Sequence, residues 1–233
     1  MIFYNGRSSD DFSVIVEQYP DRPIPQRKGE SWSVPGRSGD AYAPEEAWEN
    51  VTRSYEVYLS AEKPGLPVIA SRAMAWLSAA GYHELWDEYD RDTFVMATFK
   101  DKADIKNIQN AFGRFTLSFD CWPQRFLRSG AEELRFTAAA ELINPTGFTA
   151  EPLITLEGSG SGTLRVGDYT ITVSECSGTV LDCRDDNAYR AADGFNLNTG
   201  VSGDFPRLPP SKNEVIFSGG ITAVRIVPRW YWI

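Results

Sequence analysis

Histidine is almost absent from this sequence of 233 residues, which contains only His83. A serine triad or a histidine-based metal site would have to be built around that one residue. The sequence also lacks the GxSxG, HExxH, Walker and GxGxxG patterns of hydrolases and nucleotide-binding proteins. We therefore expect His83 to be an ordinary residue at the surface or at a strand edge, and the protein to be no enzyme and to carry no metal or cofactor.

Cysteine is scarce too, with only Cys121, Cys176 and Cys183. An odd number in a chain of this size disfavours a disulfide framework and favours folding in a reducing cytoplasm. A bridge between Cys176 and Cys183, across two neighbouring strands, is the less favoured alternative. No apolar run approaches the ~18 residues of a membrane-spanning helix, and charges stand where an export signal is apolar. We expect no membrane insertion.

Clusters of positive charge are missing as well. The chain has 23 basic and 32 acidic residues and a formal net charge of -9. Nucleic-acid-specific binding is therefore not expected, because it needs a basic patch that neutralises phosphates. Acidic residues gather at 84–92 and 182–186, without the spacing of a calcium-binding loop. We expect both clusters to be solvated, with a calcium site as a weaker alternative and a hydrolytic carboxylate pair as the weakest.

What the sequence does contain, in its first half, is a series of strand patterns. Residues 12–18 form a short apolar run rich in β-branched side chains. Residues 53–60 and 114–120 alternate large apolar with polar side chains, as half-buried strands do. Tyr55, Val57 and Leu59 share one face of the first of these strands, and Phe115, Leu117 and Phe119 share one face of the second. We expect these two sets to face a core.

Only one segment has a clear helical period. Ile69, Ala73, Trp76, Leu77 and Ala80 recur at helical spacing after Pro67, a residue suited to a first turn. Gly81 follows as a left-handed cap. The pattern predicts a helix over 67–80 that lies on a sheet. We interpret residues 101–112, the weaker helical candidate, as a polar loop.

The second half changes composition after about residue 135, where helix signals vanish and Gly, Ser and Thr increase. Residues 163–173 predict a hairpin that turns at Gly167-Asp168, and four further short apolar runs predict strands. The glycine-rich run 158–162 has no helix after it and is interpreted as a flexible loop. Strands at this spacing are typical of a β-sandwich. The predicted fold is mainly β, with an N-terminal sandwich-like domain that carries one helix and a C-terminal β-sandwich.

Several motifs occur in an order that resembles one known family. Residues 2–18 (IFYNGRSSDDFSVIVEQ) and 30–40 (ESWSVPGRSGD) precede the helix, and 119–126 (FDCWPQRF) ends the first domain. Asn144-Pro145-Thr146-Gly147 then opens the second domain, which closes on Pro-Arg-Trp at 228–230. Each motif is weak alone, but together they span nearly the whole chain. The sequence resembles the distal tail proteins of long, non-contractile-tailed bacteriophages.

The resemblance implies a structural protein of the virion tail tip, assembled in the cytoplasm of the bacterial host. It implies a ring-forming domain at 1–137 and a galectin-like sandwich at 138–233. The ring, a hexamer in the family, joins the tail tube protein to the tail-tip or baseplate proteins and leaves its lumen open for DNA. A receptor-binding protein is a further implied partner of the hub.

One loop departs from the family pattern. The family commonly reads Leu-x-Pro-Gly-x-Asn, whereas residues 208–213 here read Leu-Pro-Pro-Ser-Lys-Asn and lack the glycine. We expect the Pro-Pro turn to replace it without a positive φ.

Two sets of residues are candidates for binding. Pro35, Gly36 and Arg37 form a loop whose arginine suits a neighbouring subunit's carboxylate or carbonyl groups; a local turn with a solvated arginine is an equal alternative. Trp230 and Trp232 share a face if the chain is a strand there. Packing or a subunit contact is favoured for them, because large aromatic rings are buried in cores and at interfaces. The alternative is a carbohydrate-binding module that engages host cell-surface glycans by stacking sugars on these rings.

Overall fold

The computed structural model describes residues 1–60, 65–100, 106–108 and 112–233. In this part the protein is mainly β with one α-helix, as predicted. The chain divides into two compact units, Met1–Arg125 with Ile233, and Phe126–Trp232. The division precedes the expected boundary after residue 137, because Leu127, Leu134 and Phe136 already pack against the second core.

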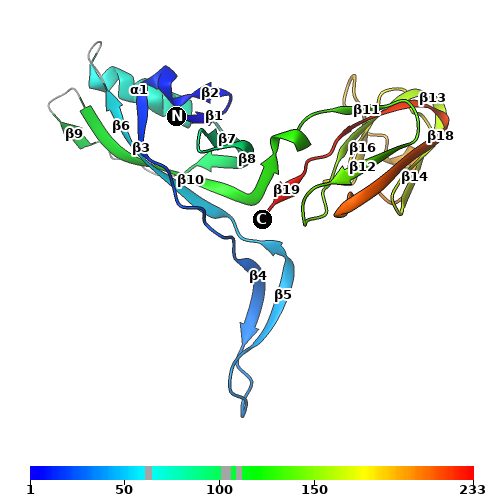
Figure 1. Ribbon diagram of the computed structural model, residues 1–233, viewed down its shortest axis with the longest axis horizontal. Helices are drawn as coiled ribbons and strands as arrows, with labels where there is room; N and C mark the ends of the chain where they lie inside the picture. The colour runs from blue at the N-terminus through cyan, green and yellow to red at the C-terminus, as the bar shows by residue number, and fades with distance from the viewer. Residues whose placement is uncertain (61–64, 101–105, 109–111) are drawn as a thin grey trace. The chain divides into compact units, whose positions relative to one another are not determined.

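The first unit is built on one antiparallel sheet (Figure 1). The strand order along it is β2-β1-β7-β8-β10-β6-β3, and β9 pairs with β10 as well. The strands of this sheet are β1 (Ile2–Tyr4), β2 (Arg7–Ser8), β3 (Val14–Gln18), β6 (Val51–Ser60), β7 (His83–Asp87), β8 (Asp90–Phe99), β9 (Lys106–Ile108) and β10 (Phe112–Leu127).

The alternating patterns on β6 and β10 are confirmed. Tyr55, Val57 and Leu59 are 0% exposed, and their antiparallel partners Leu117, Phe115 and Gly113 lie opposite on β10. Paired residues share a face of a sheet, so both strands turn the same apolar side to the core. The run at 12–18 becomes a strand only from Val14, because Phe12 ends a 3-10 helix (Ser9–Phe12).

The helix α1 (Leu66–Leu77) covers the apolar face of this sheet. Ile69, Ala73, Trp76 and Leu77 are its buried residues together with Leu66, as the spacing predicted. It ends three residues earlier than expected, where Ser78 donates from both its backbone N–H and its hydroxyl to the Met74 carbonyl.

The loop predicted over 101–112 is wrong in part. Residues 106–108 form strand β9, which pairs with β10 at Phe112–Arg114; residues 101–105 and 109–111 lie outside the described part.

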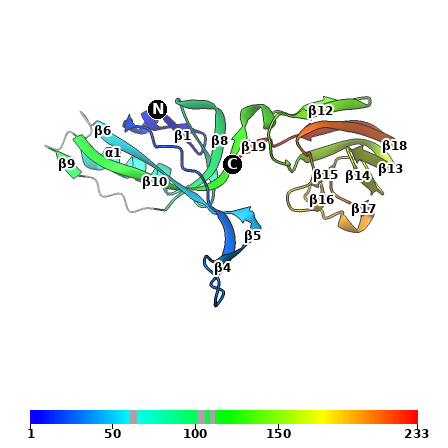
Figure 2. The ribbon, with the colours of Figure 1, turned by 60° about the horizontal axis from the view of Figure 1, so that its bottom comes forward.

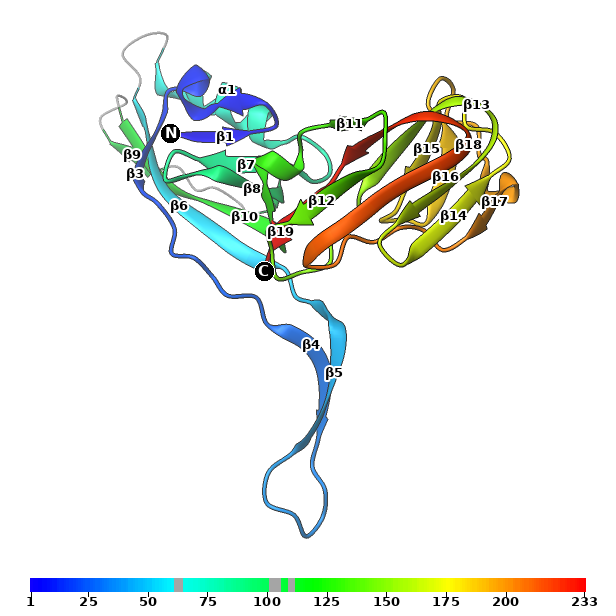
Figure 3. The same ribbon diagram turned by 45° about the vertical axis from the view of Figure 1, so that its right-hand side comes forward.

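A long hairpin of β4 (Arg27–Trp32) and β5 (Ala41–Trp48) was not anticipated from the sequence. Its two strands pair only with each other, within the described residues. Figure 3 shows it leaving the strands of the first unit between β3 and β6. All six residues of β4 are exposed, so the alternation that reveals a half-buried strand is missing here.

The second unit has the strand order β11-β18-β13-β14-β17, with β12 also on β18, β15 on β13, and β16 on β15. Figure 2 shows β12 and β18 on one side of this unit and β16 and β17 on the other. The strands of its sheet are β11 (Leu134–Phe136), β12 (Ala140–Asn144), β13 (Leu153–Val166), β14 (Tyr169–Val173), β15 (Thr179–Asp182), β16 (Asn187–Arg190), β17 (Val201–Gly203) and β18 (Ser211–Val227). The last strand, β19 (Tyr231–Trp232), pairs with β10 instead. The predicted hairpin at 163–173 is formed by β13 and β14, with Gly167 at φ 57.

The glycine-rich run is not a flexible loop. Residues 158–162 lie inside β13, where the register with β18 shifts on both sides of Gly158. Here the backbones of β13 and β18 approach so closely that a side chain on Gly158 or Gly220 would meet a carbonyl oxygen of the other strand. The glycines therefore permit a bulge between two long strands.

The turn before β18 also differs from the prediction. Ser211, at the position of the family's glycine, has a φ of 79. The Pro-Pro turn thus keeps the positive φ, and it is supported by Asn213, whose Nδ2 donates to the carbonyls of Pro209 at 3.1 Å and Ser211 at 3.1 Å.

Candidate assembly surface

The structure places Pro35, Gly36 and Arg37 at the tip of the β4–β5 hairpin. The Arg37 N–H donates to the Val34 carbonyl at 3.1 Å, and Gly36 has a φ of 78 that closes the turn. All three residues are exposed. The Arg37 guanidinium contacts no carboxylate of the described residues, so its charge is free for a partner outside the chain.

Side chains of the hairpin form hydrogen bonds that link its two strands. The Tyr42 ring lies against Gly29, where a Cβ would come within 2.7 Å of the ring carbons. The Tyr42 hydroxyl donates to the carbonyls of Arg27 at 3.1 Å and Lys28 at 3.2 Å. Arg27 in turn donates to the Glu45 carbonyl at 2.8 Å and lies 5.6 Å from the centre of the Trp48 ring.

Nothing in the described chain covers this hairpin. Trp32 is 51% exposed and Tyr42 is 50% exposed, on opposite faces. No further strand of the described residues pairs with the outer edge of either strand. A two-stranded hairpin is marginally stable in water by itself, and exposed strand edges recruit further strands. The hairpin is therefore a candidate surface for contact with a partner.

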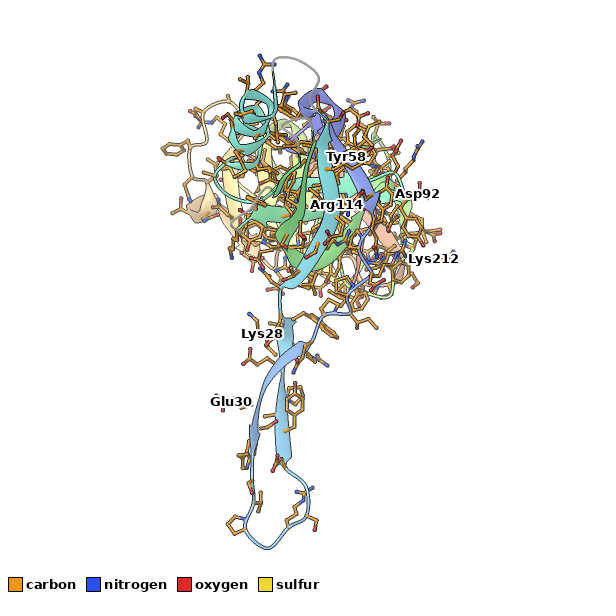
Figure 4. The ribbon with its side chains drawn as sticks, turned by 90° about the vertical axis from the view of Figure 1, so that its left-hand side faces the viewer. Lys28, Glu30, Tyr58, Asp92, Arg114 and Lys212 are labelled. Carbon is orange, nitrogen blue, oxygen red and sulfur yellow. The ribbon has the colours of Figure 1, made fainter. Side chains whose placement is uncertain are left out.

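The charges of the hairpin have both signs. Lys28 and Glu30 project from one side of it, as Figure 4 shows. Glu30, Asp40, Glu45 and Glu46 make no ion pair with a described residue. Such a surface can form charge pairs with a neighbouring protein.

The two candidate tryptophans do not share an environment. Trp230 is 4% exposed and belongs to the second core, whereas Trp232 is 37% exposed. They differ because Trp230 precedes the short strand β19 and follows Arg229, whose φ is 59. Trp230 therefore cannot offer a ring face to a sugar, and a carbohydrate site would depend on Trp232.

The first acidic cluster supports the fold. Asp87 is 5% exposed; its Oδ2 accepts from the Tyr55 hydroxyl at 2.9 Å, and its Oδ1 accepts from the backbone N–H groups of Tyr89 and Asp90. Burial, and then the charge of Asp87, raise the pKa of Tyr55 well above its usual value. His83 lies on β7 with Nε2 2.9 Å from the Ala80 carbonyl oxygen.

Two carboxylates of the second acidic cluster form ion pairs with arginines. Asp182 accepts from Arg229 at 2.7 Å, and Asp186 accepts from Arg207 at 2.9 Å. Burial opposes the ionisation of Asp182, but the hydrogen bond and charge of Arg229 outweigh it and lower its pKa.

The cysteines are shielded from solvent. All three cysteines are free and buried, and burial raises the pKa of Cys121 to about 12. Among the residues that the structure describes, no group of three or more His, Cys, Asp or Glu could hold a metal ion. The only α-helix found there is too short to cross a membrane.

Comparison with known proteins gave a full-length match among the solved structures. No protein-family model matches the sequence, and no curated protein matches it significantly. The solved structure of the Dit protein of phage SPP1 matches with a TM-score of 0.75 and 13% identity, over 100% of this chain and 98% of that one. That protein is described as a paradigm of the hub adsorption apparatus in phages that infect Gram-positive bacteria. The full-length likeness shows that this chain has the fold of a phage distal tail (Dit) hub protein, as its motifs predicted.

Proposed function

We propose that this protein is the structural hub at the distal end of a phage tail and that it closes into a hexameric ring. The fold likeness over the whole of both chains carries the proposal. In this role the ring joins the tail tube protein to the tail-tip or baseplate proteins and to a receptor-binding protein. The role is structural and needs no catalysis, membrane insertion or sequence-specific contact with DNA.

The hairpin is the element that closes the ring in this proposal. A closed ring needs a head-to-tail contact in which one patch of each subunit meets a different patch of the next. The hairpin supplies exposed aromatic rings, two free strand edges and the Pro35-Gly36-Arg37 tip. Its cover comes from the neighbouring subunit, so the residues that are exposed in one chain are buried in the ring. The second unit takes no part in closing the ring in this proposal and is free to meet other tail proteins.

The mass of the full-length protein in solution tests this proposal. Native mass spectrometry across a concentration series should give a closed hexamer for the natural chain. The double variant Trp32→Ser, Arg37→Ala should shift the population to monomers, because it removes one exposed ring and the free cation of the tip. Phe195→Ser is the matched control, since Phe195 is 60% exposed in the second unit and its loss should leave the ring intact. A natural chain that stays monomeric at every concentration, alone and with its tail tube protein, would contradict the hub.

A further inference from the structure

A pocket of about 290 Å³ lies in the first unit at the root of the hairpin. Its walls come from the segment that enters the hairpin, which includes Ile24, and from the segment that leaves it at Val51. Figure 3 shows these two segments beside each other where the hairpin begins. Trp122 adds an aromatic wall from β10, and Ile233 lines the pocket as well.

Three guanidinium groups, those of Arg22, Arg53 and Arg125, line the pocket. Only one carboxylate of the described residues pairs with them, since Asp90 lies 3.1 Å from Arg22 and 3.9 Å from Arg125. The Nε of Arg53 is buried and has no hydrogen-bond partner. Among these side chains, three cations thus share one anion.

The surroundings make this excess charge costly. Burial lowers the pKa of Arg125, and repulsion from Arg22 and Arg53 lowers it further against the attraction of Asp90. A desolvated guanidinium without a counter-ion is destabilising, and its planar donors match the two oxygens of a carboxylate. The side chains that line the pocket therefore leave it with an excess of positive charge, which a carboxylate would offset.

The hairpin holds the complementary groups. Glu30, Asp40, Glu45 and Glu46 are exposed carboxylates without an ion pair in the described part of the chain. Because the chain is acidic, with a net charge of -9, a second copy is a ready source of anions. In a head-to-tail ring, the hairpin of one subunit and the pocket of the next are different patches, as such a contact requires.

We propose that the arginine pocket at the hairpin root binds a carboxylate from the hairpin of a neighbouring copy of this chain. This inference rests on the proposed ring. It adds to it the patch that the hairpin meets, with Arg22, Arg53 and Arg125 as the receiving groups. Charge pairs in such a site fix the orientation of the neighbouring subunit, because a neighbour in the reverse orientation would leave the arginines and the carboxylates unpaired.

A double-mutant cycle on the full chain tests the pairing. One arm is Arg53→Met, which keeps the aliphatic stem and removes the charge. The other arm is Glu30→Gln, Asp40→Asn, Glu45→Gln, Glu46→Gln. Mass photometry across a dilution series measures the protein concentration at half-assembly. Each set of substitutions should raise the concentration at half-assembly at least about tenfold, a typical effect for one close charge pair. The two sets combined should raise this concentration little more than either set alone. Arg190→Met, which removes an exposed arginine paired with Asp193 in the second unit, is the control and should change nothing.

Three results would overturn the pairing. The first is that pocket variants assemble like the natural chain, the second that the hairpin variant leaves assembly unchanged, and the third that the effects of the two sets of substitutions multiply as independent effects. If Arg53→Met unfolds the protein, Arg22→Gln replaces it, since that side chain is 57% exposed. These outcomes differ from a failure of the proposed function: in that case the natural chain itself forms no ring.

Discussion

The backbone conformation of Ser211 lowers the stability of the protein. Its φ of 79 lies in the left-handed region, where a residue with a Cβ is strained. The family's glycine avoids that strain, so Ser211→Gly should raise the free energy of unfolding by roughly 0.5–1 kcal/mol after the larger entropy of the unfolded chain is subtracted. Thermal unfolding checks this. Ser202→Gly, in β17 without a positive φ, should instead destabilise by a similar amount; a loss of stability in both variants would contradict the strain.

The Asp182–Arg229 pair makes stability depend on pH. The folded state lowers the pKa of Asp182 below its value of about 3.9 in the unfolded chain. The pair therefore stabilises the fold above pH ~4, and its contribution is lost as pH falls through the folded pKa. Asp182→Asn should cost about 1.5–3 kcal/mol at pH 7 and progressively less below pH ~4. Asp193→Asn, at an exposed ion pair, should cost under about 1 kcal/mol at either pH. A penalty for Asp182→Asn that stays constant down to pH 2 would argue against the linkage.

At the scale of elements, the crossing of β13 and β18 depends on glycine. A methyl group on Gly220 would meet the backbone oxygen of Ser159, which cannot swing aside as a side chain can. Gly220→Ala should therefore destabilise the second unit by about 2–4 kcal/mol, or separate the two strands locally. Gly147→Ala is the control, because its added methyl would lie 3.9 Å from the Trp232 ring, an ordinary contact. Equal unfolding temperatures for the two variants would rule out a close crossing.

The C-terminal tryptophans provide a second test of an element. Trp230→Ala should destabilise by about 3–5 kcal/mol, because the side chain is 4% exposed in the core. Trp232→Ala should change the free energy of unfolding far less, and it should leave a glycan array as blank as the natural protein does. Saturable glycan binding that disappears with Trp232→Ala in a folded protein would favour the carbohydrate-binding alternative.

At the scale of the whole molecule, the first unit should assemble without the second. We proposed from the sequence that residues 1–137 form the ring and 138–233 the outer sandwich. A truncation that follows the two compact units ends the first fragment at Arg125. A truncation after residue 137 would leave β11 in that fragment without β18, the strand it pairs with. A fragment of residues 1–125 should still form closed rings at high concentration, and residues 126–233 should stay monomeric, both by sedimentation velocity. A monomeric first unit beside an oligomeric second would reverse the assignment.

The sequence determined the local features of this protein, because each depends on residues close together in the chain. Alternation fixed the buried faces of β6 and β10, and the spacing of Ile69, Ala73 and Trp76 fixed the helix. The order of short motifs was sufficient to predict the distal tail fold. Tip residues 35–37 were identified as a loop, but the long hairpin that carries them was missed, since a strand exposed on both faces has no periodic pattern.

Only the tertiary structure decided what depends on distant residues. It brought Arg22, Arg53 and Arg125 from three segments into one pocket, and it showed that a single carboxylate pairs with them. It turned a glycine run that looked flexible into a bulge, because the reason for those glycines is the backbone of β18, about sixty residues away in sequence. It separated Trp230 from Trp232, since a single left-handed residue, Arg229, redirects the chain just before the last strand. Side-chain spacing cannot reveal such contacts, because they are set by how strands cross and not by which residues are neighbours in the chain.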